Sequence, residues 1–291
     1  MAGFLEQTVN GLVNGGFYAM LALGLAVIFG MLGVVNFAHG ACYMLGAYGA
    51  YVVLHSLGLP FWWALAIVPA VLLVFGMALE RTLVSRLTRL DPLYNFLLTF
   101  GVTLVLQAVV TWHFGPAANP YEPPAELAGA LRVGSFVYPE YRLFVFGVAA
   151  FCCVLAWWTL SRTRVGVVVR AATERPELTR ALGVNVGRWV TPVFGFGIAL
   201  AALAGVLAAP VQAVSPLMGA DLIIVVFAVV VIGGLGSIIG SVVTGFAVGV
   251  LTSWAQAYAP AVVGQLLIFV LMAVVLLVRP AGLFGTQEAP V

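Results

Sequence analysis

The residues of this chain that could act on a solute are few, and most are uncharged. His39 follows Asn36 in the segment Asn36-Phe37-Ala38-His39-Gly40, where a long apolar run is interrupted. An ionisable side chain inside a membrane often marks an ion, proton or substrate route. A histidine at a helix break can also satisfy the backbone carbonyls freed there. We expect this structural role first, and a titrating role for His39 stays open.

Uncharged amides and a tyrosine extend this polar set along the apolar runs. Such side chains line a wet solute path or hydrogen-bond one helix to another, and each alone more often joins helices. Asn95, Gln256 and Gln265 are neutral candidates for either role. The residues that we predict for a substrate pathway are Asn10, Asn14, Tyr18, Asn36, His39 and Gln107.

Catalysis by the chain itself has little support in the sequence. It contains no H-E-x-x-H, G-x-S-x-G or Walker A motif, and no pair of carboxylates within an apolar run. Cys42, Cys152 and Cys153 lie in apolar runs, without metal-ligand spacing or the even number that a disulfide framework needs. We therefore predict that the chain is not an enzyme and has no catalytic residue, metal site or cofactor of its own.

The elements that must position these polar residues are membrane-spanning helices. Of the 291 residues, 63% are hydrophobic and only 8% are charged, whereas a soluble domain carries about a quarter charged residues. The predicted fold is all-α, a polytopic membrane protein with about eight or nine transmembrane helices. Some of these helices are expected to be broken or re-entrant.

Nine apolar runs make up the predicted spans, and two of them are too short to cross about 30 Å of hydrocarbon unaided. One follows the break at Asn36, and the other runs into Gly233-Gly234-Leu235-Gly236-Ser237. The nine runs cover residues 9–35, 41–54, 61–79, 92–112, 143–160, 189–209, 222–232, 239–254 and 263–278.

Arginines predict the orientation, because cationic loops stay in the cytoplasm. Of the twelve arginines, three lie in residues 80–91, six in residues 161–188 and one at Arg279, against two in residues 113–142. The first two loops are therefore expected inside the cell, and the third outside. Nine crossings would place the C-terminus in the cytoplasm and the N-terminus outside, while a re-entrant run would reverse the N-terminal side.

Residues 161–188 form the longest stretch too polar for lipid. Pro176 suits the first turn of a helix and Gly183 the left-handed position after its end, so we predict a helix of about two turns. Such a short helix is only marginally stable by itself, so it must pack on another surface. The chain's own transmembrane ends and a cytoplasmic protein are equally open as that surface. Its apolar face comprises Leu178, Ala181 and Leu182, and Glu177 can pair with Arg180.

Small residues at every fourth position predict close helix contacts, because lipid gives apolar helices no other reason to associate. Tight packing is the expected role of each such ridge, and a movable central bundle is the alternative. The three ridges are Gly233, Ser237, Ser241, Gly245 and Gly249; Ala38, Cys42, Gly46 and Ala50; and Gly197, Ala201, Gly205 and Ala209.

Short motifs spread over nearly the whole chain resemble one family. The opening motifs are residues 18–24, Ile28-Phe29-Gly30, Asn36-Phe37-Ala38-His39-Gly40 and residues 44–48, and the later ones are residues 163–166, 170–184, 231–237 with Gly240, and 279–285. Together they resemble branched-chain amino acid ABC importer permeases, and specifically the shorter of two paralogous subunits, called the H type.

The resemblance implies partners and a site. It implies a second, M-type permease subunit, two cytoplasmic ATPases that use ATP and Mg, and an extracytoplasmic substrate-binding protein. It also implies that residues 170–184 contact an ATPase and couple it to the permease. The coupling residues expected on this basis are Arg170, Glu174, Glu177, Leu178, Ala181, Leu182 and Gly183.

We therefore expect a single transmembrane permease domain, residues 1–291, in a bacterial inner membrane. Its first half is about 1–160, its cytoplasmic coupling segment about 161–188 and its second half about 189–285. The predicted function is uptake of branched-chain amino acids or a related amide, urea or aromatic acid, with no nucleic-acid partner. The alternative is a self-contained secondary transporter, with paired discontinuous helices near Asn36 and Gly233.

Overall fold

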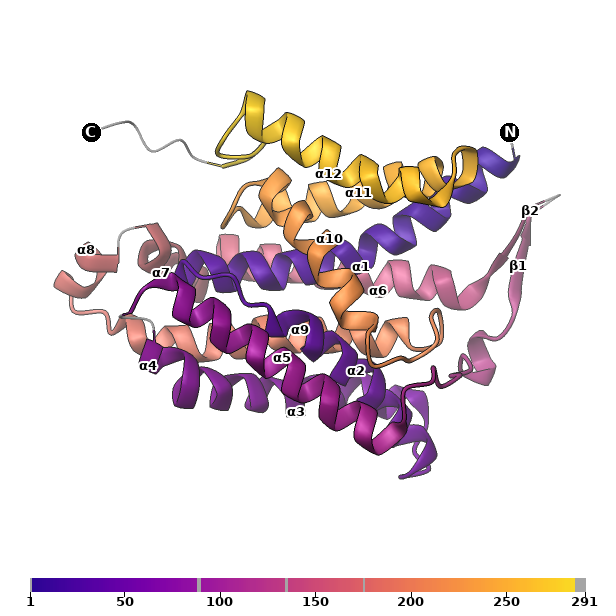
Figure 1. Cartoon of the computed structure of the whole chain (residues 1–291), viewed down its shortest axis with the longest axis horizontal. Helices are drawn as coiled ribbons and strands as arrows, with labels where there is room; N and C mark the ends of the chain where they lie inside the picture. The colour runs from indigo at the N-terminus through magenta and orange to yellow at the C-terminus, as the bar shows by residue number, and fades with distance from the viewer. Residues whose placement is uncertain (1, 88–89, 134–135, 175, 286–291) are drawn as a thin grey trace. The chain divides into compact units, whose positions relative to one another are not determined.

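Helices make up almost all of the structure, a computed structural model that describes residues 2–87, 90–133, 136–174 and 176–285. Nine long apolar helices lie in these ranges (Figure 1). They are α1 (Ala2–Leu32), α2 (Ala38–His55), α3 (Phe61–Leu79), α5 (Pro92–Phe114), α6 (Glu140–Arg162), α9 (Val186–Ala208), α10 (Met218–Gly233), α11 (Ile238–Tyr258) and α12 (Ala261–Val278). The predicted all-α, polytopic membrane fold is confirmed.

Within the described residues, six helical stretches are long and apolar enough to cross a membrane: Gly3–Leu32, Phe61–Leu87, Pro92–Phe114, Glu140–Arg162, Val186–Ala208 and Ile238–Tyr258. The two runs predicted to be short correspond to α2 and α10, which have 18 and 16 residues. Both predicted interruptions are present, since α1 and α2 are separate helices, as are α10 and α11.

A small hairpin in residues 113–142 was not predicted. Strand β1 (Ala130–Val133) pairs with β2 (Phe136–Pro139) in antiparallel register, with Leu131 opposite Tyr138, after one 3₁₀ turn, η2 (Ala125–Leu127). Strands of four residues give too short an alternating pattern to recognise in sequence. The hairpin leads directly into α6 (Figure 1).

Contacts between residues group the chain into two compact units, each assembled from segments far apart in sequence. Unit 1 consists of Met1–Ala26, Pro123–Val154 and Ile224–Val291, and unit 2 consists of Val27–Glu122 and Leu155–Ile223.

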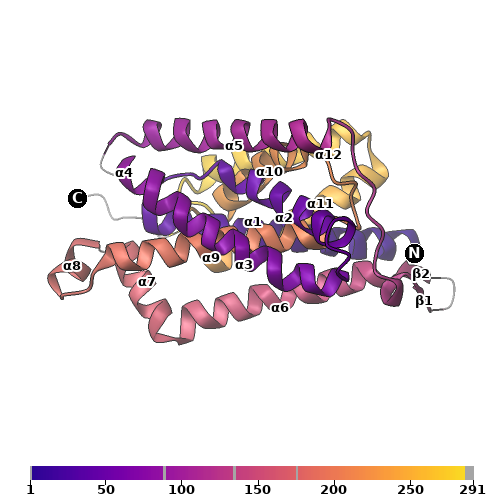
Figure 2. The ribbon, with the colours of Figure 1, turned by 90° about the horizontal axis from the view of Figure 1, so that it is seen from below.

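Unit 2 is built on close contacts of α9 with α2 and α3. A methyl group at Gly46 of α2 would clash with the backbone of Ala202, and one at Gly205 of α9 would clash with the carbonyl of Tyr43. These contacts confirm that the ridges containing Gly46 and Gly205 are sites of tight packing. Figure 2 shows α9 running beside α3 in this unit.

Unit 1 brings α11 against α1 in the same way. A methyl group at Gly245 would lie 2.6 Å from the backbone nitrogen of Ala19, and one at Gly249 would clash with Gly15. The predicted ridge is not continuous, however. Gly233 is the last residue of α10, and Ser237 is the N-cap of α11, whose side chain accepts a hydrogen bond from the Gly240 N–H at 3.2 Å. Only its last three members lie within one helix: Ser241, Gly245 and Gly249.

The C-terminal motif packs on the end of α10 in unit 1. The N–H groups of Leu283 and Phe284 donate to the carbonyls of Ile232 and Gly233 at 2.9 and 3.1 Å. Two motifs that carry the family resemblance, residues 231–237 and 279–285, are therefore joined by their backbones.

The two segments predicted to be cytoplasmic lie at the same end of unit 2 in both ribbon views (Figures 1 and 2). One is a π-helical turn, η1 (Glu80–Val84), continued by α4 (Ser85–Leu87). The other is the helix pair α7 (Arg164–Glu174) and α8 (Pro176–Ala181). Helix α8 matches the predicted short helix, whereas α7 was not predicted.

Candidate functional site

The break between α1 and α2 is a turn held by hydrogen bonds to Asn36. The turn leaves α1 through Gly33, whose φ of +65° favours glycine. Asn36 Oδ1 then accepts the Ala38 N–H at 3.1 Å, and the Asn36 carbonyl accepts the His39 N–H at 3.3 Å. Asn36 therefore satisfies a backbone N–H at the start of α2, and the carbonyl-capping role expected of His39 stays a prediction. His39 is fully buried on the first turn of α2, and its titrating role stays a prediction.

Helix α5 presents a stripe of polar residues at four-residue spacing: Asn95, Thr99, Thr103 and Gln107. This spacing places them on one face of a helix. Asn95 is 0% exposed and Thr99 is 2% exposed, although most of their neighbours along α5 are exposed. The helix begins with Asp91 as its N-cap, which accepts the Leu93 N–H at 2.9 Å, and with Pro92 in its first turn.

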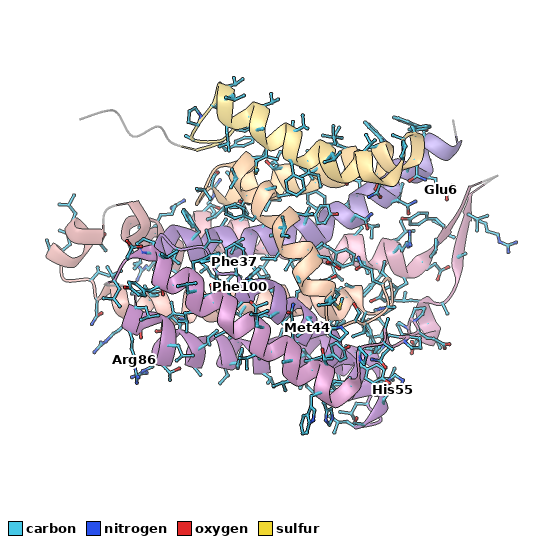
Figure 3. All side chains as sticks on the ribbon, in the orientation of Figure 1. Glu6, Phe37, Met44, His55, Arg86 and Phe100 are labelled. Atoms are coloured by element: carbon cyan, nitrogen blue, oxygen red, sulfur yellow. The ribbon has the colours of Figure 1, made fainter. Side chains whose placement is uncertain are left out.

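The polar stripe of α5 lies against the α1–α2 turn. The Phe37 N–H donates to Thr99 Oγ1 at 3.2 Å, and the Phe37 ring meets Phe96 edge-on at 4.9 Å between centroids. Phe96 in turn stacks on Phe100 at 6.1 Å. Figure 3 labels Phe37 and Phe100 at this contact, which we call the α5 joint and define by Asn36, Phe37, Asn95 and Thr99.

Polar groups at the α5 joint and along the rest of the α5 stripe differ in whether they are hydrogen-bonded. Thr103 Oγ1 donates to the Thr99 carbonyl at 2.9 Å within α5. In contrast, Asn36 Nδ2, both amide atoms of Asn95 and Gln107 Nε2 are buried and have no hydrogen-bond partner among the described residues. Each such group disfavours the folded state by about 1–3 kcal/mol. The joint is therefore a buried polar site with unused hydrogen-bonding capacity.

The other predicted pathway residues lie in unit 1 and are engaged differently. Asn10, Asn14 and Tyr18 share one face of α1 by their four-residue spacing. Asn10 Oδ1 accepts two hydrogen bonds, from Arg142 at 2.7 Å and from Tyr138 at 2.8 Å.

Two further hydrogen-bonding groups of unit 1 are the phenol of Tyr138 and the indole of Trp254. Burial raises the pKa of Tyr138 above 10.0, with Arg142 opposing the shift, so its phenol stays protonated and able to donate at neutral pH. The indole N–H of Trp254 in α11 donates to Thr8 Oγ1 of α1 at 3.1 Å. Helix α1 is thus connected to the β1–β2 hairpin through Asn10 and to α11 through Thr8.

The structure brings together only part of the predicted pathway set. Asn36 and His39 flank Phe37, which contacts the α5 face that also carries Gln107, whereas Asn10, Asn14 and Tyr18 belong to unit 1. Thr99 and Thr103 were not predicted, because a single threonine in an apolar helix does not indicate a functional site. Their signal is the four-residue spacing with Asn95 and Gln107, which is as regular as the ridges of small residues.

The predicted coupling helix, α8, is held on α7 by a side-chain hydrogen bond and also contacts the start of α9. Thr179 is buried and donates to the Ala171 carbonyl at 2.8 Å, and Gly183 has the predicted left-handed φ, +85°. Leu178 and Leu182 are 54% and 83% exposed.

The remaining coupling residues fall into three groups. Ala181 and Gly183 are exposed, while Arg170 reaches back to the Ser161 carbonyl at 3.4 Å. Arg175 and the side chains of Glu174, Glu177 and Arg180 lie outside the described residues, so the predicted Glu177–Arg180 pair stays a prediction.

A buried carboxyl group links two helices near this segment. Glu80 is 4% exposed at the start of η1, and its Oε2 accepts the Thr191 hydroxyl of α9 at 2.6 Å. Because α9 begins shortly after α8, this contact connects the helix that follows the coupling segment to the end of α3.

Sequence comparison identifies relatives over nearly the full length. The chain is 30% identical to the high-affinity branched-chain amino acid transport system permease protein LivH of Salmonella typhimurium, over 98% of this chain and 96% of that protein. It is 31% identical to the corresponding protein BraD of Pseudomonas aeruginosa, over 98% and 97%. The fructose import permease protein FrcC of Rhizobium meliloti is 30% identical over 60% of this chain and 50% of that protein.

A solved structure shares the fold. PsaBC from Streptococcus pneumoniae, in complex with Fab, has a TM-score of 0.52 with 14% identity, over 97% of this chain and 94% of that one. The family model of the branched-chain amino acid transport system permease component matches residues 7–276. The chain therefore belongs to the branched-chain amino acid transport permease family.

Proposed function

We propose that the chain is one of two permease subunits of an ABC importer that takes up branched-chain amino acids or a chemically related small solute. The observation that carries this proposal is the match to LivH and BraD, which extends over 98% of the chain and so includes both units. The partners are an M-type permease, two ATPases that bind ATP and Mg, and an extracytoplasmic binding protein. The permease sits in the bacterial inner membrane.

The coupling contact of the proposed importer is the outer face of α8. Thr179 holds α8 on α7 while Leu178 and Leu182, one turn apart, stay exposed, which is an arrangement suited to a partner's apolar cleft. Leu182 is followed closely by Asn185, whose side chain accepts the Arg188 N–H at 3.3 Å and so caps α9. Force applied at α8 would therefore enter α9 directly.

The Glu80–Thr191 contact extends this path within unit 2. It joins α9 to the π-helical turn at the end of α3, and both helices also pack through Gly76, where a methyl group would lie 2.9 Å from the Ile198 side chain. Movement of α9 would therefore carry α3 with it. This supports a mechanism in which ATPase closure moves several helices of unit 2 as a group.

Reconstitution of the complete importer tests the function. The chain and its proposed partners would be placed in liposomes, and uptake of labelled leucine, isoleucine, valine, urea, acetamide and phenylalanine would be measured with and without ATP. We expect ATP-dependent uptake of at least one of these solutes, which requires the binding protein. Uptake by the chain alone without ATPases would instead favour the secondary transporter.

Cysteine labelling tests the orientation. The single cysteines would be introduced at Glu126, in the segment 113–142, and at Leu182, in the coupling segment; both positions are exposed. In intact cells an impermeant thiol reagent should label Glu126→Cys and should label Leu182→Cys only after the membrane is opened. The reverse pattern would invert the proposed topology.

A further inference from the structure

We propose that Asn36 and Asn95 of the α5 joint form a binding site for the zwitterionic end of an amino-acid solute. This inference rests on the proposed function and specifies where, within unit 2, the permease holds its solute. The two side chains come from the α1–α2 turn and from α5, which meet at the hydrogen bond from Phe37 N–H to Thr99 Oγ1. Asn36 precedes Phe37, and Asn95 lies one helical turn before Thr99 on the same face.

The unused groups of the α5 joint match the polar end of an amino acid. The group that Asn36 leaves unused is its Nδ2 donor, since its Oδ1 already accepts the Ala38 N–H. Asn95 supplies a further donor and an acceptor, and neither has a partner among the described residues. Two amide donors suit a carboxylate, and one amide oxygen suits an ammonium group. The site therefore offers complementary groups for both charges of a zwitterion.

Neutral amides suit a site through which the solute must pass. Hydrogen bonds from an amide to a charged group stabilise binding less than a buried ion pair with good geometry could. A transport site must bind well enough to select and weakly enough to release. Amides also leave no net charge in the membrane when the solute has gone.

In this structure the α5 joint is closed to a solute. Few contacts hold it closed. Asn36 and Asn95 are 2% and 0% exposed. The rings of Phe37, Phe96 and Phe100 pack in sequence beside them, and Phe37 N–H to Thr99 Oγ1 ties the turn to α5. Burial of unmatched amides opposes this closure, so opening of the turn from α5 would let a solute reach both asparagines.

The variant Asn95→Leu tests whether Asn95 binds the solute or only supports the fold. Leucine has a similar size but no polar atom, so it removes both unmatched groups and should leave thermal stability unchanged or higher. The complete importer in liposomes would be assayed for leucine uptake at saturating binding protein. We expect the uptake rate to fall by about tenfold or more, the effect of losing a hydrogen bond to a charged group.

Thr103→Val is the matched control. Thr103 belongs to the same buried stripe, but its hydroxyl already donates to the Thr99 carbonyl within α5. Uptake by this variant should stay within about twofold of wild type. A second test variant, Asn36→Asp, keeps an oxygen that can accept the Ala38 N–H, while it removes the Nδ2 donor. Its leucine uptake should fall as for Asn95→Leu.

The outcomes distinguish the site from the function. Wild-type uptake of leucine, together with normal uptake by Asn95→Leu, would overturn the site and leave the importer intact. Equal loss of uptake in Asn95→Leu and Thr103→Val would also overturn it, because the stripe would then serve packing alone. A wild-type importer that takes up none of the tested solutes would overturn the proposed function, and the site with it.

Discussion

The two units use buried polar side chains in opposite ways. In unit 1, Asn10 accepts hydrogen bonds from Tyr138 and Arg142, and so links α1 to the hairpin and to α6. In unit 2, the amide of Asn95 is fully buried, and neither of its polar atoms has a partner among the described residues. Both asparagines are neutral amides in apolar helices, and nothing in residue type separates them.

This difference shows how an amide in a membrane helix can be assigned a role. An amide whose hydrogen bonds are made within the protein stabilises packing, and its replacement should weaken the fold. An amide that is buried without hydrogen-bond partners does not stabilise the fold. The protein should be at least as stable when an apolar residue replaces it. Replacement by leucine therefore gives opposite changes in stability at the two positions.

The largest expected effect concerns the exposed face of α8 in unit 2. Replacing Leu178 and Leu182 together with aspartate should abolish ATP-dependent uptake, because two charges would enter an apolar contact with the ATPase. Expression and membrane insertion should not change, since both side chains are exposed. Uptake and ATPase pull-down would be measured against Val167→Asp, an exposed position on α7. Retained pull-down with normal uptake would show that α8 is an ordinary loop helix.

Gly245→Leu should be the most damaging single change in unit 1. A methyl group there would already lie 2.6 Å from the backbone of Ala19, so leucine must push α1 and α11 apart. Overpacking of this kind costs about 1–3 kcal/mol or more. Thermal unfolding in detergent and the yield of assembled complex would be measured, with the half-exposed Leu251→Ala as control. Wild-type stability of Gly245→Leu would show that the α1–α11 contact can relax.

Thr191→Val tests the link from the coupling segment into the rest of unit 2. The change removes the hydroxyl that donates to the buried Glu80 carboxyl at 2.6 Å. Loss of a donor to a buried carboxyl group should lower stability by about 1–3 kcal/mol. If α9 moves α3 through this contact, ATP hydrolysis per solute transported should also rise. Thr191→Ser keeps the hydroxyl and should behave as wild type; a serine variant as impaired as the valine one would point to the lost methyl group.

Asn10→Leu tests the comparison of the two asparagines most directly, with the smallest effect. It leaves Arg142 and Tyr138 without their shared acceptor, but Asn10 is only half-buried and water can replace part of the contact. We expect a loss of about 1 kcal/mol in stability. Asn14→Leu, one turn away, should change stability less. The distinction between the units would fail if Asn10→Leu and Asn95→Leu shifted thermal unfolding in the same direction.

Local sequence features were sufficient to predict the long apolar helices and the breaks between them. Apolar runs long enough to cross lipid must be helical, since lipid offers no partner for backbone N–H and C=O groups. The expected start and end of α8 also followed from Pro176 and Gly183, because proline and glycine restrict the backbone locally. The β1–β2 hairpin and α7 were missed. Strands of four residues carry too little pattern, and α7 lies in a polar segment where tertiary packing supports the helix.

Pairing between distant segments was beyond sequence reasoning. Asn10, Asn36 and Asn95 looked equivalent as isolated amides, and a resemblance to a family does not say which of them finds a partner. Their difference arises because Arg142 and Tyr138, over 120 residues away in sequence, reach Asn10. Asn95 instead lies one helical turn before Thr99, which accepts the Phe37 N–H, and finds no partner of its own among the described residues. The sequence by itself determined that the chain is helical, membrane-spanning and a relative of amino-acid permeases, because composition and motifs are local. Only the tertiary structure decided which polar groups remain unmatched, because hydrogen bonding depends on side chains that meet after folding.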